Sequence, residues 1–360
     1  MRDVVRKAKH PGFYLKEAIE ELGLNQTEFA TRSGLSIKNV STIINGESRI
    51  TFEVALKLAS FFNTGVEGWI NLQTKYDVYQ NEQSTKEEIA NEWKIAKQFK
   101  NTFVSTLLDE GINEENKKQT ILNLRSCFKV GTLEALKKPD MYAFCKTSIK
   151  KDLTEKNIIM RNAWISIAEQ IARNKTCNTF NSDIINQNRL NLRRLTLEDP
   201  TSFQPKLDSI LSSAGIKLVI LPYLQNSLVG GVTKWLSNDN CVLVAVNDCG
   251  KDADKIWFSI FHEIGHAMQN HKRHLTISYE KGQIEDEDEI AANKLAKELL
   301  INEDDYCRFI KNGNYDLKSI RMFARQQNVA DFIVLGRLQK DGYVDWNKYQ
   351  DIKKKYSISF

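Results

Sequence analysis

The chain has 360 residues, of which 41% are hydrophobic and 27% charged, and its formal net charge is +5. This length predicts two or three domains, and the apolar content excludes a wholly disordered chain. The first residues lack the apolar run of a secretory signal, and no stretch approaches the ~20 apolar residues that span a bilayer. We therefore expect a cytoplasmic protein with no membrane partner, whose six scattered cysteines are free thiols.

Residues 1–81 have the apolar spacing of a compact five-helix domain. Within it, residues 26–46 follow the order of a helix-turn-helix unit. Ala30 lies where two helices cross closely, Gly34 permits the sharp turn, and Val40 and Ile43 bury the second helix. The outward side chains of that second helix are short and polar, as suits contacts to phosphates and base edges. The sequence therefore predicts a DNA-binding unit here.

The sequence around this unit resembles the HigA-type antitoxin and repressor domain over residues 10–77. The resemblance rests on the segments PGFYLKEAIEELGLNQTEFA, INGESRITFEVALKLASFF and GWINLQTKYD. The resemblance implies double-stranded operator DNA as a partner, and helix-turn-helix units usually bind as dimers, so we expect a homodimer. By comparison with phage-repressor units, the base-reading positions are Ile37, Lys38 and Thr42, and the phosphate-contacting positions are Gln26, Ser36 and Asn39.

Residues 82–199 read as a helical linker or regulatory region with no chemical motif. Basic residues outnumber acidic ones between Lys137 and Arg194. Two interpretations stay open for this excess: a solvated helical face, or a second contact surface for DNA or a partner. The predicted helices are residues 86–107, 114–128, 133–147, 154–172 and 181–192.

The sequence pattern changes after Pro200, from helical periodicity to short β-rich runs. Residues 216–221 (IKLVIL) and 241–246 (CVLVAV) are short β-rich runs separated by the pair Gly230-Gly231. A helix is expected over residues 255–270, and an acidic stretch leads into another that runs to about Leu300. The remaining residues are expected to be helical and then irregular.

The sharpest signal is the motif FHEIGH. His262 and His266 stand four residues apart, so on a helix they project from one face and both imidazoles can reach one zinc ion. Glu263 lies beside them, close enough to take a proton from a water molecule. Catalytic zinc takes three protein ligands and keeps one position open. The third ligand should then be a carboxylate from a later helix.

Glu289 fits that third position best. Asn293 lies one helical turn after it, on the same face, where an amide can orient Glu289 or a ligand histidine. Glu285 and Glu287 remain chemically possible alternatives. The sequence thus predicts a Zn²⁺ site with Asn293 in support.

The segments FSIFHEIGHAMQNH and EIAANKLAKELLI together resemble the ImmA/IrrE family of zinc metallopeptidases over about residues 205–301. The resemblance implies that His262, His266 and Glu289 bind the metal and that Glu263 is the general base. Two positions depart from the usual family pattern without removing a ligand: Ala291 and Leu295. The implied fold class is multidomain and mainly α with a small α+β part. It comprises the helix-turn-helix domain, the helical middle, and a zincin-like metallopeptidase domain over residues 200–360, with a small sheet, the HExxH helix and a helical tail.

The run just before the active-site helix is a candidate substrate strand, because an extended peptide could pair with it by β-augmentation. Its residues are Val242, Leu243, Val244, Ala245 and Val246. A second donor to the substrate carbonyl is also expected. The choice among Tyr279, His271 and His274 stays open.

These features predict a DNA-binding regulator of the antitoxin or repressor type that carries a zinc-dependent endopeptidase. It would selectively cleave a repressor, a partner toxin or itself. The alternative is a non-proteolytic DNA-binding scaffold whose zinc site is structural or sensory. The intact Glu263 favours the peptidase, because a structural site has no need of a base there.

Overall fold

The computed structural model describes residues 8–142, 145–147, 153–236, 240–269, 275–279 and 287–356. The chain divides into two compact units, residues 1–91 and 92–360. The boundary falls inside the long helix α5 (Val66–Ala96). The predicted limits at residues 81 and 199 stay a prediction. Among the described residues, no helix combines the length and the apolar content that a membrane crossing needs.

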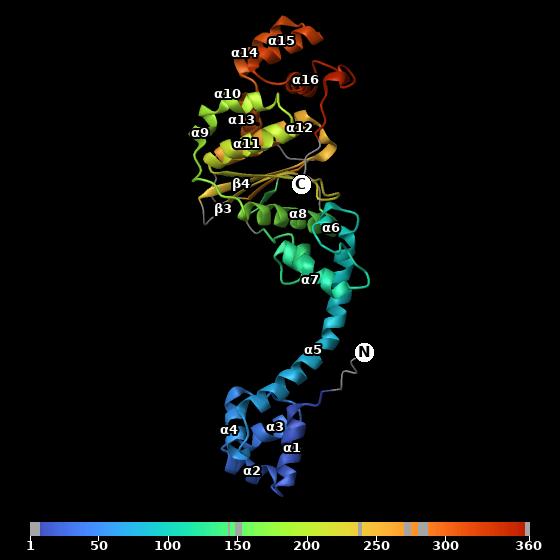
Figure 1. The fold of residues 1–360 in the computed structure, drawn as a ribbon, viewed down its shortest axis with the longest axis vertical. Coiled ribbons are helices and arrows are strands. Elements are labelled where there is room, and N and C mark those ends of the chain that lie inside the picture. The colour runs from blue at the N-terminus through green and yellow to red at the C-terminus, as the bar shows by residue number, and fades with distance from the viewer. Residues whose placement is uncertain are drawn as a thin grey trace. The chain divides into compact units, whose positions relative to one another are not determined.

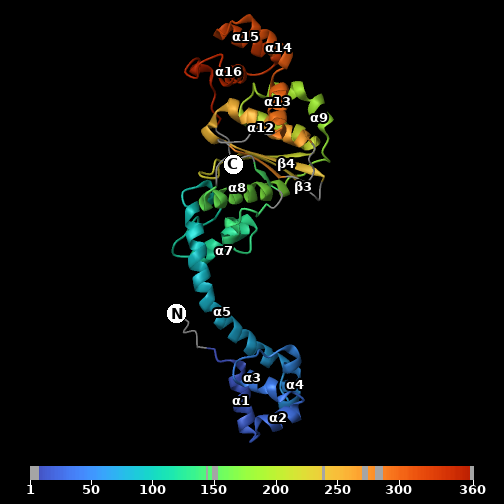
Figure 2. The same cartoon turned by 180° about the vertical axis from the view of Figure 1, so that it is seen from behind.

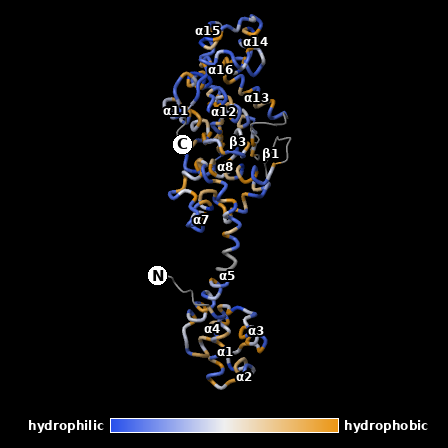
Figure 3. Tube along the Cα trace, turned by 90° about the vertical axis from the view of Figure 1, so that its right-hand side faces the viewer, coloured by the Kyte–Doolittle hydropathy of each residue, from blue (hydrophilic) through white to orange (hydrophobic). Residues whose placement is uncertain are grey.

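The first unit is a bundle of short helices (Figure 1): α1 (Pro11–Glu21), α2 (Gln26–Ser33), α3 (Ile37–Ile44), α4 (Phe52–Phe62) and the start of α5. Figure 3 shows apolar and hydrophilic positions interspersed along these helices, as amphipathic packing requires. Their inward faces form one core around Leu15, Phe29, Val40 and Leu58. The predicted five-helix domain is confirmed.

The second unit is built on a five-stranded mixed sheet with the order β1-β5-β3-β4-β2. Strand β3 runs antiparallel to both β4 and β5, whereas β2 runs parallel to β4 and β1 parallel to β5. Two of these strands match the predicted β-rich runs, and the Gly230-Gly231 pair lies inside β3 rather than between strands. The strands are β1 (Cys145–Thr147), β2 (Ile216–Leu221), β3 (Val229–Leu236), β4 (Cys241–Asn247) and β5 (Leu275–Tyr279).

Helices cover both faces of the sheet (Figures 1 and 2). On one face lie α11 (Pro200–Ser213), α12 (Ala253–Met268) and α13 (Glu287–Leu300), and on the other lies α8 (Glu155–Arg173). Two consecutive residues of β3 demonstrate the alternation: Thr233 bonds to Glu263 on α12, and Lys234 pairs with Glu169 on α8. A side chain of β3 therefore meets α12 only at alternate positions.

One hydrophobic core joins the α12 side of the sheet to the C-terminal helices. These are α14 (Glu303–Asn312), α15 (Leu317–Gln327) and α16 (Asp331–Lys340). The short helices α9 (Ser182–Gln187) and α10 (Arg189–Leu195) add Ile185, Leu192 and Leu195 to the same core. The last part of the middle region, residues 182–195, thus packs with the C-terminal part of the chain.

The middle region corrects several sequence expectations. The helix predicted over residues 133–147 is wrong: a short 3-10 helix (Leu133–Lys137) is followed by β1. The helix predicted over residues 181–192 is split at Asn188 into α9 and α10. Residues 86–96 continue α5, and then come a 3-10 helix (Lys97–Phe99) and α6 (Phe103–Thr106). Helix α7 (Lys117–Phe128) and helix α8 lie close to the predicted ranges.

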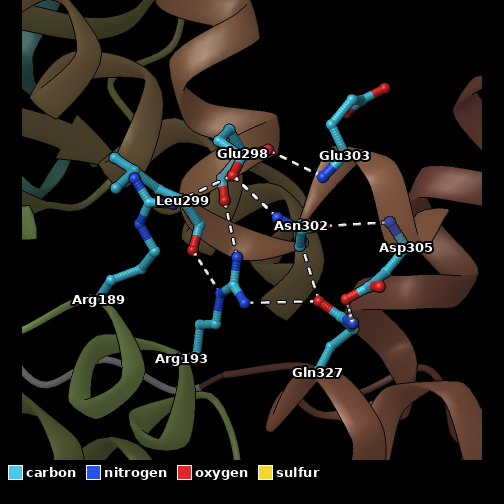
Figure 4. Close-up of polar contacts among 8 residues, drawn as sticks. All are labelled: Arg189, Arg193, Glu298, Leu299, Asn302, Glu303, Asp305 and Gln327. Carbon is cyan, nitrogen blue, oxygen red and sulfur yellow. Dashed lines mark hydrogen bonds and ion pairs between the residues drawn. The ribbon is translucent and has the colours of Figure 1, made fainter. Parts of the chain in front are cut away.

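The basic excess of the middle region is not simply a solvated face, because Arg161 and Arg193 are buried. Arg161 donates to the Pro139 carbonyl at 2.9 Å. Arg193 donates to the carbonyls of Glu298 and Leu299, both at 2.8 Å, at the C-terminal end of α13 (Figure 4). A cation is favourable there, because the last helical carbonyls have no intrahelical donor. These two arginines are therefore structural.

Candidate metal centre and nucleic-acid interface

Helix α12 presents its histidines because its apolar face is buried against the sheet. Asp254 supplies an acidic residue to the first turn, which favours helix initiation there. Trp257 is fully buried, and its indole nitrogen donates to the Tyr356 hydroxyl at 2.9 Å. With that face held in the core, His262 and His266 project together from the helix, toward α13.

Three side chains meet at one buried point between α12 and α13. His262 Nε2 lies 3.3 Å from Glu289 Oε2, and His266 Nε2 lies 3.5 Å from Glu289 Oε1. The two Nε2 atoms are 3.1 Å apart, and the potential ligand atoms of all three residues lie within 4.8 Å of one another. Two imidazole nitrogens and a carboxylate converging in this way can hold a metal ion.

The close approach of the two helices depends on Gly265. A Cβ atom at this position would lie 2.9 Å from the Ala292 carbonyl oxygen and 3.1 Å from Ala292 Cα. Ala292 follows Glu289 by nearly one helical turn on α13. The missing side chain of Gly265 therefore lets α13 come near enough for Glu289 to reach the histidines.

The electrostatics of the cluster suit a cation. Burial alone would raise the pKa of Glu289, but its hydrogen bonds with His262 and His266 lower that pKa to about 2. Burial alone would lower the pKa of His262, but Glu289 and the nearby charge of Glu263 outweigh it, so this pKa is raised. Glu289 is thus an anion at neutral pH, as a metal ligand must be.

Asn293 lies against the other ring nitrogen of His262. The distance from Asn293 Oδ1 to His262 Nδ1 is 3.0 Å. An amide oxygen accepts there if Nδ1 carries the proton, which leaves Nε2 free to face the cluster. The contact therefore favours the ring tautomer that a metal site requires.

Glu263 is 1% exposed and lies beside the cluster on α12. The Thr233 hydroxyl, on β3, donates to Glu263 Oε2 at 2.6 Å. A Cβ atom on Gly231 would lie only 2.3 Å from Glu263 Oε1. Sequence reasoning missed both β3 residues. The Gly230-Gly231 pair is the signal that could have found them, although by itself it predicts a connection between the two β-rich runs.

The sequence left open alternatives for the third metal ligand and for the donor to the substrate carbonyl, and the structure describes two of these residues, Glu287 and Tyr279. Glu287 is an exposed first residue of α13 and is not part of the described cluster. Glu285, His271 and His274 lie outside the described residues. Tyr279 points away from α12, because β5 pairs Thr276 with Thr233 and Tyr279 is an odd number of residues further along. That placement is against Tyr279 as a donor to a substrate carbonyl.

The predicted substrate strand is wrong. Strand β4 pairs with β2 on one side and with β3 on the other, and every residue of it is buried. Its backbone groups are already used in the sheet, so no extended peptide can add there. The correction applies to Val242, Leu243, Val244, Ala245 and Val246.

The helix-turn-helix unit is locally built. Asn25 caps α2 by accepting from the Glu28 amide at 2.9 Å, and Ser36 caps α3 by accepting from the Asn39 amide at 3.1 Å. Gly34 ends α2 in the left-handed region, with φ 70°. Together these features place α3 directly after a short turn.

The outer face of α3 holds the residues predicted to touch DNA. Ile37, with 51% of its surface exposed, and Lys38 are open to solvent, and Thr42 is half-buried with its hydroxyl donating to the Asn39 carbonyl at 3.1 Å. Gln26, at the start of α2, is also exposed. The structure therefore leaves these side chains at the surface of one helix-turn-helix unit.

Comparisons with known proteins agree with both parts of the chain. A family described as Helix-turn-helix matches residues 15–69, and one described as IrrE N-terminal-like domain matches residues 213–334. An uncharacterized HTH-type transcriptional regulator, YbaQ of Escherichia coli (strain K12), is 36% identical over 92 residues, which cover 25% of this chain and 81% of that protein. This chain belongs to the family of HTH-type transcriptional regulators.

Within that family the similarity extends to antitoxins. Antitoxin HigA-1 of Vibrio cholerae is 33% identical over 106 residues, which cover 29% of this chain and 93% of that protein. The antitoxin HigA of Pseudomonas aeruginosa, solved with the higBA promoter, is 25% identical and has a TM-score of 0.22, with 23% of this chain and 90% of that one covered. This HigA-like regulator thus carries a metallopeptidase-like domain after its helix-turn-helix, and both predicted resemblances are confirmed.

Proposed function

We propose that the protein is a DNA-binding repressor or antitoxin-type regulator, acting in the cytoplasm, that carries a selective zinc-dependent endopeptidase. The observation that carries the proposal is the buried group of His262, His266 and Glu289 with Glu263 beside it. Two histidines and a carboxylate are the ligand set of a catalytic zinc site, and an adjacent carboxylate is the base that such a site needs.

His262, His266 and Glu289 would hold the Zn²⁺ ion, with Asn293 orienting the His262 ring. Bound zinc supplies a Lewis acid that makes a water molecule acidic near neutral pH and polarises a carbonyl group. Glu263 accepts the proton from the attacking water and later donates it to the leaving amine of the cleaved peptide bond. Its near-complete burial keeps that proton away from bulk solvent.

For DNA, we propose that two copies of the chain bind an operator, each with α3 in the major groove. Ile37, Lys38 and Thr42 would read base edges. Gln26, Ser36 and Asn39 would contact phosphates, where they position the unit without carrying sequence information. The exposure of Ile37 and Lys38 supports this role, because an apolar side chain that faces solvent on a recognition helix can contact a thymine methyl group.

The protein substrate is proposed to be a repressor, a partner toxin or the chain itself. The experiment incubates the wild type and Glu263→Gln with zinc and each candidate, with and without the DNA upstream of the protein's own gene. Intact-mass analysis then detects cleavage. We expect one or a few wild-type cuts that Glu263→Gln does not make. Identical fragments from both proteins would reveal a contaminating protease and contradict the catalytic role.

A second candidate is a non-proteolytic regulator whose zinc is structural or sensory. The observation in its favour is burial: His262, His266 and Glu289 are only 6%, 5% and 1% exposed. A closed site of this kind resembles structural zinc more than an open catalytic centre. If the wild type cleaves nothing and Glu263→Gln represses normally, while removing zinc abolishes repression, this second function holds.

A further inference from the structure

We infer that Thr233 is a positioning residue that fixes the carboxylate of Glu263 for proton transfer, an inference that rests on the proposed peptidase function. The Thr233 hydroxyl is 2.6 Å from Glu263 Oε2 and 3.0 Å from the Glu263 carbonyl oxygen. A distance of 2.6 Å is typical of a hydroxyl that donates to a charged carboxylate, and such bonds are stronger than those between neutral groups. Thr233 is itself buried, at 2% exposure.

The sheet is shaped around both carboxylate oxygens. Gly231 lies two residues before Thr233 and therefore on the same face of β3. Any larger side chain at this position would run into Glu263 Oε1, since even a Cβ would lie 2.3 Å away. The backbone of Gly231 does not lie in the left-handed region, so the glycine is needed there for space and not for its conformation. Gly231 thus leaves space for Oε1 of Glu263, and Thr233 donates a hydrogen bond to Oε2.

Nothing else in the described residues donates a hydrogen bond to the Glu263 side chain. A buried carboxylate with a single hydroxyl donor has one favoured orientation, and it becomes free to rotate when that donor is removed. Misplacing a catalytic group costs turnover far more than substrate binding. Replacing Thr233 with the isosteric valine should therefore lower kcat while leaving KM and the metal site in place.

The matched control is Thr276. It lies on β5 directly opposite Thr233 of β3, so it is the same residue type on the same face of the sheet. Among the described residues it makes no hydrogen bond to Glu263. The set of full-length proteins is the wild type, Thr233→Val, Thr233→Ser and Thr276→Val. Each is loaded with zinc, and the metal content and thermal midpoint are recorded first.

Turnover is then measured on a bacterial proteome digested with trypsin, with Glu263→Gln as the blank. A peptide cleaved by the wild type provides kcat and KM. We expect Thr233→Val to keep its zinc and its KM but to lose about 10- to 100-fold in kcat, on the scale seen when a catalytic group is misplaced. Thr233→Ser, which keeps the hydroxyl, should recover most of that loss, and Thr276→Val should match the wild type.

A second measurement does not depend on cleavage. A double-mutant cycle in urea unfolding compares the wild type, Thr233→Val, Glu263→Ala and the double variant. Coupling of about tenfold in the unfolding constant is expected for a hydrogen bond to a charged group. If the wild type cleaves and Thr233→Val keeps full kcat, the inference is overturned and the peptidase stands. If the wild type cleaves neither the digest nor any candidate protein, the proposed function fails. Additive effects in the cycle would overturn the positioning of Glu263 by Thr233, whatever the outcome of the cleavage assays.

Discussion

The helix-turn-helix unit and the metal centre are assembled in different ways. The helices of the first begin and end through contacts between near neighbours, such as the caps from Asn25 to Glu28 and from Ser36 to Asn39. The second brings Glu289 on α13 to His262 on α12, and Thr233 on β3 to Glu263 beside them. Local contacts follow from residue order, whereas the metal centre exists only if separate elements pack at the right distance. The two regions should therefore respond differently to substitution.

The largest effect is expected at the metal centre, where His266→Ala should abolish stoichiometric zinc binding. Removing one of three protein ligands leaves two, which is below the number found in catalytic zinc sites. The measurement is the zinc content of purified protein, with about one equivalent expected in the wild type. Glu263→Gln is the control and should retain zinc, because Glu263 is not a ligand. Full zinc content in a His262→Ala/His266→Ala variant would place the site elsewhere.

A second test concerns Glu92, a buried residue of the second unit that also depends on distant segments. Its carboxylate accepts from Arg125, from the Thr132 hydroxyl at 2.9 Å and from the Leu133 amide at 2.9 Å. Glu92→Gln should lower the free energy of unfolding by about 2–3 kcal/mol, because it leaves the Arg125 charge without its partner. Urea unfolding at pH 7 measures the loss, and the exposed Glu115 supplies a control substitution.

The same residue predicts a pH dependence. Burial would raise the pKa of Glu92, but the Arg125, Leu133 and Thr132 contacts outweigh it and lower the pKa below its usual value. A lowered pKa in the folded state means that the carboxylate stabilises the fold above its unfolded pKa of about 4.3, and that this is lost as the pH falls through the folded value. The pH dependence of unfolding in acid should thus be shallower in Glu92→Gln. An unchanged profile would mean that Glu92 does not titrate differently on folding.

Gly265→Ala tests whether helix spacing decides the metal centre. The added methyl group would lie 2.9 Å from the Ala292 carbonyl, so α12 and α13 must separate. Overpacking of this kind costs about 1–3 kcal/mol of stability. Zinc affinity should fall as well, because Glu289 moves with α13. Gly68→Ala, at a helical glycine with open space around its Cβ, is the control. Unchanged zinc affinity in a destabilised Gly265→Ala protein would separate packing from metal binding.

The smallest effect is expected in the locally built unit. Lys38→Ala should weaken binding to the specific operator by about 1–2 kcal/mol, as is usual for a base-contacting residue, without changing the fold. Fluorescence anisotropy with operator and unrelated DNA measures the difference. Affinity should also fall steeply with salt. Unchanged affinity and base preference would remove Lys38 from the reading face.

The residue order by itself determined the helix-turn-helix and the HExxH helix. Capping by Asn25 and Ser36, the turn at Gly34 and the four-residue spacing of His262 and His266 are local rules, and a local rule can be applied without a tertiary structure. The choice of Glu289 also followed from a helical repeat, since Asn293 lies one turn away. In each of these features, the interacting residues are only a few positions apart in the sequence.

Only the tertiary structure decided the strand pairing and what surrounds the base. The run Cys241–Asn247 reads the same whether it is an edge strand or a central one, and the pairing with β2 and β3 makes it central. Likewise, no spacing rule connects Thr233 or Gly231 to Glu263, because they meet across a sheet–helix interface. Such contacts depend on which elements pack together, and that is determined by the burial of the whole apolar surface, not by any one segment.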